Sequence, residues 1–108
     1  MSNSGKNPKS ELEKEIYKYI GEQIFQSRKE TLKLSREKFE EKIVASKLGY
    51  GNDKEFFSIS NQMIKHYELG SKESPISKFF IIAILLDMDL NKLKNDIGKN
   101  FHIFPFKK

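Results

Sequence analysis

A regular spacing of aliphatic side chains constrains the first third of this chain more than any other feature. These residues stand four positions apart: Leu12, Ile16, Ile20 and Ile24. Because an α-helix turns once in about 3.6 residues, this spacing aligns them on one apolar face. Ser10 and Glu13 precede that face in the arrangement of a capping box. We therefore expect a helix from about residue 10 to residue 32.

Four further helices are predicted by an N-capping side chain or a run of apolar positions at helical spacing. We expect them at about residues 35–48, 60–69, 77–87 and 89–98. Gly49, Gly70 and Gly98 stand where three of them would end, because glycine readily adopts the left-handed conformation of a helix C-terminus. The segment 77–87 is apolar on nearly every side, which is typical of a helix buried in a bundle or shared with a partner chain. The predicted fold class is all-α, a compact five-helix bundle.

The 108 residues are enough for one domain. Residues 1–9 are rich in Ser, Asn, Gly and Lys and are predicted to be a disordered tail. The domain itself is expected over residues 10–98, with an aromatic C-terminal tail at 99–108. The sequence shows neither a signal peptide nor an apolar run long enough for a membrane span, so we expect a soluble, cytoplasmic, nucleoid-associated protein.

Composition narrows the classes of function. The net charge of +5 favours an anionic partner, nucleic acid first and an anionic membrane surface second, although a modestly basic surface can also serve solubility alone. The chain has no cysteine, which excludes a thiol nucleophile and cysteine-ligated zinc. Its two histidines, His66 and His102, have no neighbouring acidic pattern of a triad or metal site, and no glycine-rich phosphate loop occurs. We expect no enzyme activity, no metal and no cofactor.

Residues 60–70 combine a serine cap, polar positions, an isoleucine, an aromatic residue, a glutamate and a final glycine. This segment resembles the third helix of the Cro/C1-repressor-type (XRE-like) helix-turn-helix family. Other segments, in the same order along the chain, are similar to that family's remaining helices: residues 20–24, 28–30, 34–37, Pro75 with the apolar helix after it, and 88–93. The resemblance covers roughly residues 16–97. It implies a lambda-repressor-like fold that binds double-stranded DNA in a sequence-specific manner.

The resemblance also implies which residues contact DNA. They are Arg36, Ser60, Asn61, Gln62, Lys65, His66 and Lys72. Asn61 and Gln62 are the first candidates for base edges, because amide side chains can bond bidentately to adenine, and Lys65 is the third. The helix N-termini at Ser60 and Arg36 would face phosphates. The alternative is that these residues form an ordinary solvated helix face.

Arg28 and Glu68 are expected to have a different role. Domains of the family often pair an arginine on the first helix with a glutamate near the end of the third. The resemblance therefore implies an Arg28–Glu68 ion pair that supports the recognition helix without reading bases.

The chain departs from the family between its second and third helices. The capping serines of these helices are 25 residues apart, whereas the motif normally needs about 11. Two registers are open. In the first, the second helix begins at Ser35 and Arg36 beside DNA. In the second, the part that packs on the third helix is centred on Val44 and Ala45, which would bring Glu40 and Glu41 near phosphate. We expect one long helix and an inserted loop at 49–58, with Arg36 at the DNA and Ala45 packed.

The C-terminal tail carries four large apolar residues: Phe101, Ile103, Phe104 and Phe106. They predict either a strand that pairs within the protein or its dimer, or a peptide that docks on a partner from the transcription machinery. The leading functional hypothesis is a transcriptional regulator that acts as a homodimer or with a partner, because one such domain makes few base contacts. The alternative is a helical protein-interaction module, an antitoxin or adaptor, acting through the apolar fourth helix or the tail.

Overall fold

In a computed structural model of the chain, the described residues are 10–48 and 57–106. They form five α-helices and no strand: α1 (Glu11–Gln26), α2 (Arg36–Ala45), α3 (Asn61–Leu69), α4 (Ile76–Leu85) and α5 (Leu90–Asn100). A π-helical turn, η1 (Ser27–Thr31), continues α1. The prediction of an all-α chain with five helices is confirmed for this part of the chain. The tail predicted at 1–9, most of the inserted loop and Gly49 lie outside the described residues.

Side-chain caps begin four of the helices, as the sequence predicts. Each capping oxygen accepts a hydrogen bond from the backbone N–H three residues later: Ser10 for α1, Ser35 for α2, Ser60 for α3 and Asp89 for α5. These bonds satisfy backbone donors that have no partner inside the helix. Helix α4 follows Pro75 without a side-chain cap. Its start therefore depends on proline's fixed backbone angle rather than on a capping hydroxyl.

Glycine ends only one of these helices. Gly70 has a φ of 71° after α3, where the left-handed conformation predicted for it is observed. The turns after η1, α2, α4 and α5 contain non-glycine residues with φ between 52° and 57°: Lys33, Lys47, Asp87 and His102. The prediction that Gly98 ends the last helix is wrong, since α5 continues to Asn100. The chain after α5 folds back over Gly98, where Ile103 donates its backbone N–H to the Gly98 carbonyl at 2.8 Å and an added Cβ would lie 2.9 Å from the Ile103 carbonyl oxygen.

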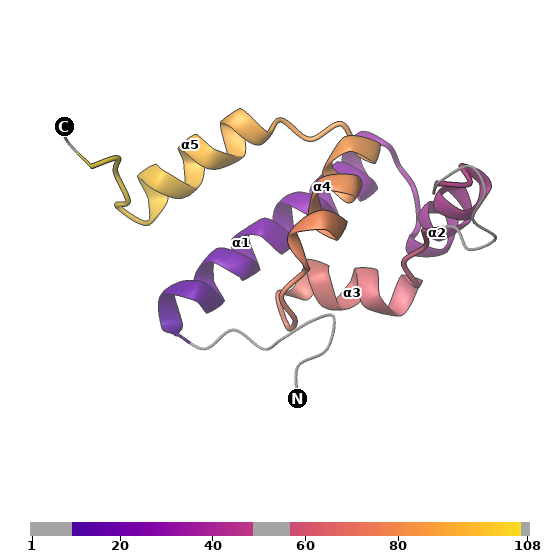
Figure 1. Ribbon diagram of the computed structural model, residues 1–108, viewed down its shortest axis with the longest axis horizontal. Coiled ribbons are helices and arrows are strands. Elements are labelled where there is room, and N and C mark those ends of the chain that lie inside the picture. The colour runs from indigo at the N-terminus through magenta and orange to yellow at the C-terminus, as the bar shows by residue number, and fades with distance from the viewer. Residues whose placement is uncertain (1–9, 49–56, 107–108) are drawn as a thin grey trace.

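The core lies between α1, α2, α3 and α4 (Figure 1). Its buried members are Ile24, Phe39, Ile43, Ile59, Ile64, Tyr67, Ile82 and Leu86. Helix α3 crosses α1 closely at Gly21, where an added Cβ would lie 2.5 Å from the Tyr67 carbonyl oxygen and closer still to that of Glu68. Helix α5 extends along α1 and buries Leu93 (Figure 1). Helices α1 and α3 are therefore in close backbone contact at Gly21, which fixes α3 against α1.

Helix α2 begins at Arg36, as in the first of the two open registers, while its position beside DNA stays a prediction. Phe39 and Ile43 are buried, whereas Val44 is 54% exposed and Ala45 is exposed as well. The expectation that Ala45 packs is therefore wrong, and so is the extension of this helix to residue 48. The helical period explains the result, because residues four positions apart share a face and the next residue is turned by about 100°.

Helix α4 is only half buried, so it is not the bundle-enclosed helix that is one of the two expectations for it, whereas a helix shared with a partner chain stays a prediction. Ile82 and Ala83 face the core, whereas Ile76, Phe80 and Ile84 are 73%, 44% and 72% exposed. The helix lies on the outside of the body, so only one of its faces meets other helices (Figure 1). We call Ile76, Phe80 and Ile84 the α4 stripe. No helix in the described ranges is long and apolar enough to cross a membrane.

Candidate nucleic-acid interface

Helix α3 has sharply different inner and outer faces. Ile64 and Tyr67 are buried against the core, while Gln62 and Lys65 are exposed. Burial raises the pKa of the Tyr67 hydroxyl, which has no hydrogen-bond partner among the described residues. The exposed amide and ammonium lie one turn apart, within the first five residues of the helix. This outer face offers a donor–acceptor group and a cation to an external ligand.

A buried ionic network holds the inner face of α3. Glu68 accepts hydrogen bonds from Arg28 Nε at 2.5 Å and Arg28 Nη2 at 2.9 Å, so the pair expected from the sequence is present. Arg36 Nε donates to the same carboxylate at 3.0 Å. The side chains of Arg28 and Glu68 are 3% and 1% exposed, whereas that of Arg36 is 31% exposed. One carboxylate thus joins α3 to η1 and to the first turn of α2.

Arg28 is bonded at every nitrogen of its guanidinium group. Besides its two bonds to Glu68, Nη1 donates to the Leu34 carbonyl at 2.6 Å. The group also lies 5.5 Å from the centre of the Phe25 ring, a cation–π distance. Arg28 belongs to the π-helical turn, in which the Leu32 N–H bonds to the Ser27 carbonyl five residues back. Such turns are rare, and many occur at functional sites.

Asn61, the first candidate for a base contact, is engaged inside the protein. Glu40 Oε1 accepts from the Asn61 backbone N–H at 3.1 Å and from its side-chain Nδ2 at 2.8 Å. The Ser60 hydroxyl accepts from the Met63 N–H at 3.2 Å and keeps its own O–H as a donor. The carboxylate of Glu40 therefore lies at the N-terminus of α3, where the helix dipole stabilises negative charge. This leaves Gln62 and Lys65 as the freer candidates on α3.

The remaining sequence candidates lie near the other end of α3. His66 Nδ1 lies 3.0 Å from the Ser71 hydroxyl, which also donates to the His66 carbonyl at 3.2 Å. Lys72 is half-buried in the loop before α4. The His66 ring is thus held against its own helix terminus rather than extended from the surface.

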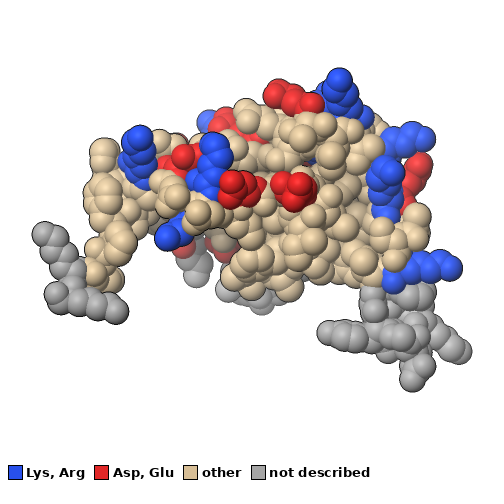
Figure 2. All heavy atoms as spheres, turned by 90° about the horizontal axis from the view of Figure 1, so that it is seen from above, with Lys and Arg blue, Asp and Glu red and all other residues tan. Residues whose placement is uncertain are grey.

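Exposed lysines surround the α2 end of the molecule. Four of them lie on α2 or in the turns beside it: Lys33, Lys38, Lys42 and Lys47. Figure 2 shows blue side chains gathered at its right-hand end, where α2 lies in Figure 1, with acidic side chains among them. The start of α3 contacts α2 through Glu40. Helix α2 also carries Glu37, Glu40 and Glu41, so these lysines give this end of the molecule a modest excess of positive charge, which attracts a polyanion.

The C-terminal tail divides into an anchored and an exposed part. The Phe101 ring meets Tyr19 edge-on at 6.4 Å and so folds onto α1. Ile103, Phe104 and Phe106 are exposed, Phe106 to 98%. Residues 101–106 form no strand, so the strand that would fold back on the same domain is not observed in this part of the chain, whereas a strand that pairs with a second copy stays a prediction.

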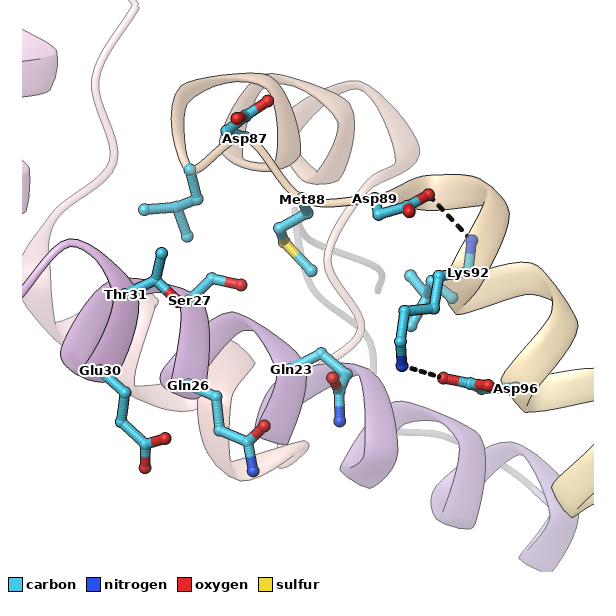
Figure 3. A pocket seen from close by; sticks show the side chains of 12 residues that line it. Gln23, Gln26, Ser27, Glu30, Thr31, Asp87, Met88, Asp89, Lys92 and Asp96 are labelled. Atoms are coloured by element: carbon cyan, nitrogen blue, oxygen red, sulfur yellow. Dashed lines mark hydrogen bonds and ion pairs between the residues drawn. The ribbon is translucent and has the colours of Figure 1, made fainter.

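A polar hollow of about 270 Å³ lies away from α3, between α1, η1 and the α4–α5 connection (Figure 3). Its acidic lining consists of Glu30, Asp87, Asp89 and Asp96. Lys92, the basic residue of the lining, donates to Asp96 at 2.8 Å, and this hydrogen bond lowers the pKa of the Asp96 carboxyl. An excess of carboxylates repels phosphate, and no residue of α2 or α3 lines the hollow. The hollow is therefore separate from the candidate nucleic-acid interface.

Sequence reasoning missed two long-range contacts in this region, Arg36 with Glu68 and Glu40 with Asn61. Both connect α2 to α3 across the inserted segment, and no local pattern indicates such pairs. Comparison of the chain with protein-family models, with curated protein sequences and with solved structures gives no match.

Proposed function

We propose that this protein is a sequence-specific DNA-binding transcriptional regulator, in which α3 enters the major groove. The observation that carries the proposal is the network of Glu68 with Arg28 and Arg36. It fixes the inner side of a short capped helix while Gln62 and Lys65 remain exposed on the outer side. A recognition helix needs this combination, because base readout requires side chains held in a defined orientation.

The residues divide into two roles under this proposal. Gln62 and Lys65 contact base edges, with adenine the natural partner of a glutamine amide and guanine that of a lysine. Arg36, Lys72 and the lysines around α2 contact phosphates and set the register of the protein on the duplex. Arg36 Nε is bonded to Glu68, and the exposed part of its guanidinium group is available to a phosphate oxygen.

Gln62→Ala is the direct test. Rounds of selection from random duplexes are expected to give the wild type a preferred site, and Gln62→Ala to lose the preference at one base pair of that site. The loss of a bidentate contact is worth about 1–3 kcal/mol of discrimination. Gln26→Ala, an exposed glutamine on α1, is the matched control and leaves the preference unchanged. Absence of any preferred site for the wild type at moderate salt would contradict the proposal.

A second copy of the chain completes the proposed regulator, since two half-sites are needed for high specificity. We place the contact on the α4 stripe, whose three side chains lie four residues apart on one exposed face. They expose on the order of 300 Å² of apolar surface, within the range of functional patches on small proteins. Lys78 is the one charged residue of α4, so two stripes can meet with little charge repulsion.

Ile84→Glu is therefore expected to make the protein monomeric. Sedimentation should show the wild type at twice the 12.7 kDa mass of one chain and this variant at that mass. Because Ile84 is 72% exposed, the substitution leaves the fold intact. Val44→Glu places the same charge on α2 at a 54% exposed position and leaves the dimer unchanged. A wild type that sediments as a monomer at all concentrations contradicts this assignment.

A helical protein-interaction module is the second candidate function. The observations that favour it are the α4 stripe and the exposed tail residues Ile103, Phe104 and Phe106. In a regulator, the same tail can recruit a partner from the transcription machinery. Removal of residues 103–108 would then abolish activation and leave DNA affinity intact, whereas an adaptor would lack selective DNA binding altogether.

A further inference from the structure

The contact between Glu40 and Asn61 changes the chemistry at the N-terminus of α3. An asparagine amide has two N–H donors and one carbonyl acceptor. Glu40 Oε1 takes one of those donors at 2.8 Å and the Asn61 backbone N–H at 3.1 Å. A carboxylate oxygen can bond to the nitrogen of the amide and not to its oxygen, so the contact fixes which way the Asn61 amide points.

The polar atoms of Glu40 and Asn61 that this contact does not use form an edge rich in hydrogen-bond acceptors. Glu40 Oε2 and Asn61 Oδ1 make no hydrogen bond within the described residues, and one amide N–H of Asn61 also remains. Both side chains are only partly buried, so a ligand at the start of α3 can reach this edge. An acceptor edge is complementary to an exposed amino group. In the major groove, cytosine N4 and adenine N6 are the amino groups presented.

We infer that Glu40 and Asn61 together are a specificity-determining pair for cytosine at the base pair nearest the N-terminus of α3. This inference rests on the DNA-binding function proposed above and deepens it. Cytosine is preferred to adenine because the major-groove edge of adenine also carries the N7 acceptor, which repels a carboxylate, whereas cytosine presents its amino group alone. The remaining N–H of Asn61 can meet O6 of the paired guanine. Asn61 alone would favour adenine, so its bond to Glu40 changes the base that it selects.

A purely structural role for Glu40 predicts a different result. As a cap of α3 it would affect stability, or affinity for every sequence equally. As a carboxylate near phosphates it would weaken binding to every duplex, again without preference. A change in base preference at one position is therefore the readout that separates specificity from structure.

The experiment compares wild type, Glu40→Gln and Asn61→Ala on the selected duplex and on its single-base variants. The wild type is expected to prefer cytosine at one position by about 5- to 150-fold, the range of a good base contact. Both variants are expected to reduce this preference to less than about threefold and to leave the other positions unchanged. Glu37→Gln, an exposed glutamate on the first turn of α2, removes the same charge and keeps the preference.

The outcomes separate the two proposals. A wild type with a selected site whose cytosine preference survives Glu40→Gln, or with adenine, guanine or thymine at that position, overturns the assignment of the pair and leaves DNA binding standing. A wild type with no selected site removes the proposed function and the pair with it. Thermal melting of Glu40→Gln checks folding, and Asn61→Ala provides an independent test because the Ser60 cap of α3 remains in place.

Discussion

Glu68→Gln is expected to destabilise the protein by about 3–5 kcal/mol, a large part of its total stability. The substitution preserves side-chain volume but removes the negative charge that two arginines share. Arg28 is then left with a buried charge that has no counter-ion. Removal of one partner from a buried ion pair typically lowers the free energy of unfolding by about 3–5 kcal/mol. A domain of this size has a total stability of about 5–15 kcal/mol. Urea denaturation followed by circular dichroism measures the change.

Two further variants show whether the cause is the unpaired charge. Glu37→Gln removes an exposed carboxylate and should change stability by less than about 0.5 kcal/mol. The double variant Arg28→Met with Glu68→Leu removes both buried charges and should be clearly more stable than Glu68→Gln, because apolar side chains of similar size replace such pairs well. If the double variant has a lower free energy of unfolding than Glu68→Gln, an unpaired buried charge does not explain why Glu68→Gln is destabilised. The hydrogen bonds of the network would then contribute stability of their own.

Local signals in the sequence located the helices that carry the candidate interface. Ser60 and Gly70 mark the two ends of α3 correctly, because capping depends on residues within one turn of the helix. The Arg28–Glu68 pair followed from a family resemblance, not from spacing. The observed contact agrees with that expectation, whereas the DNA-binding role that the same resemblance implies stays a prediction.

Contacts that depend on tertiary structure could not be read from the sequence. Asn61 looks like a free base reader in isolation, and only the approach of α2 shows that Glu40 holds its amide. Val44 fits an apolar helical pattern, yet it is exposed because Phe39 and Ile43 already fill the face toward the core. Lys33 adopts positive φ with no glycine signal near it, and Lys47 does so before Gly49, the glycine expected to end that helix. In each case a partner far along the chain, or the shape of the core, decides between locally acceptable alternatives.

Gly21→Ala is expected to destabilise the protein by about 2–3 kcal/mol, which lowers the melting temperature by roughly 8–20 °C. An added Cβ would lie 2.5 Å from the Tyr67 carbonyl oxygen and closer still to that of Glu68, both in the backbone of α3. Backbone atoms inside a helix cannot move aside singly, so α1 and α3 must separate as units. Their separation would also stretch the bonds between Arg28 and Glu68. Alanine's better helix propensity, worth about 1 kcal/mol, offsets only part of this cost.

Gly98→Ala is the matched control, because it makes the same substitution in the last turn of a helix and gains the same propensity. The added Cβ would lie 2.9 Å from the Ile103 carbonyl oxygen, a backbone atom that must shift, but residues 102–106 are exposed and their shift does not separate two helices of the core. Its melting temperature should therefore change by only a few degrees in either direction. If Gly21→Ala melts at the temperature of Gly98→Ala or above the wild type, α1 and α3 do not cross in close backbone contact. The position of α3 would then depend on the Glu68 network and on its buried side chains, Ile64 and Tyr67, rather than on backbone contact at Gly21.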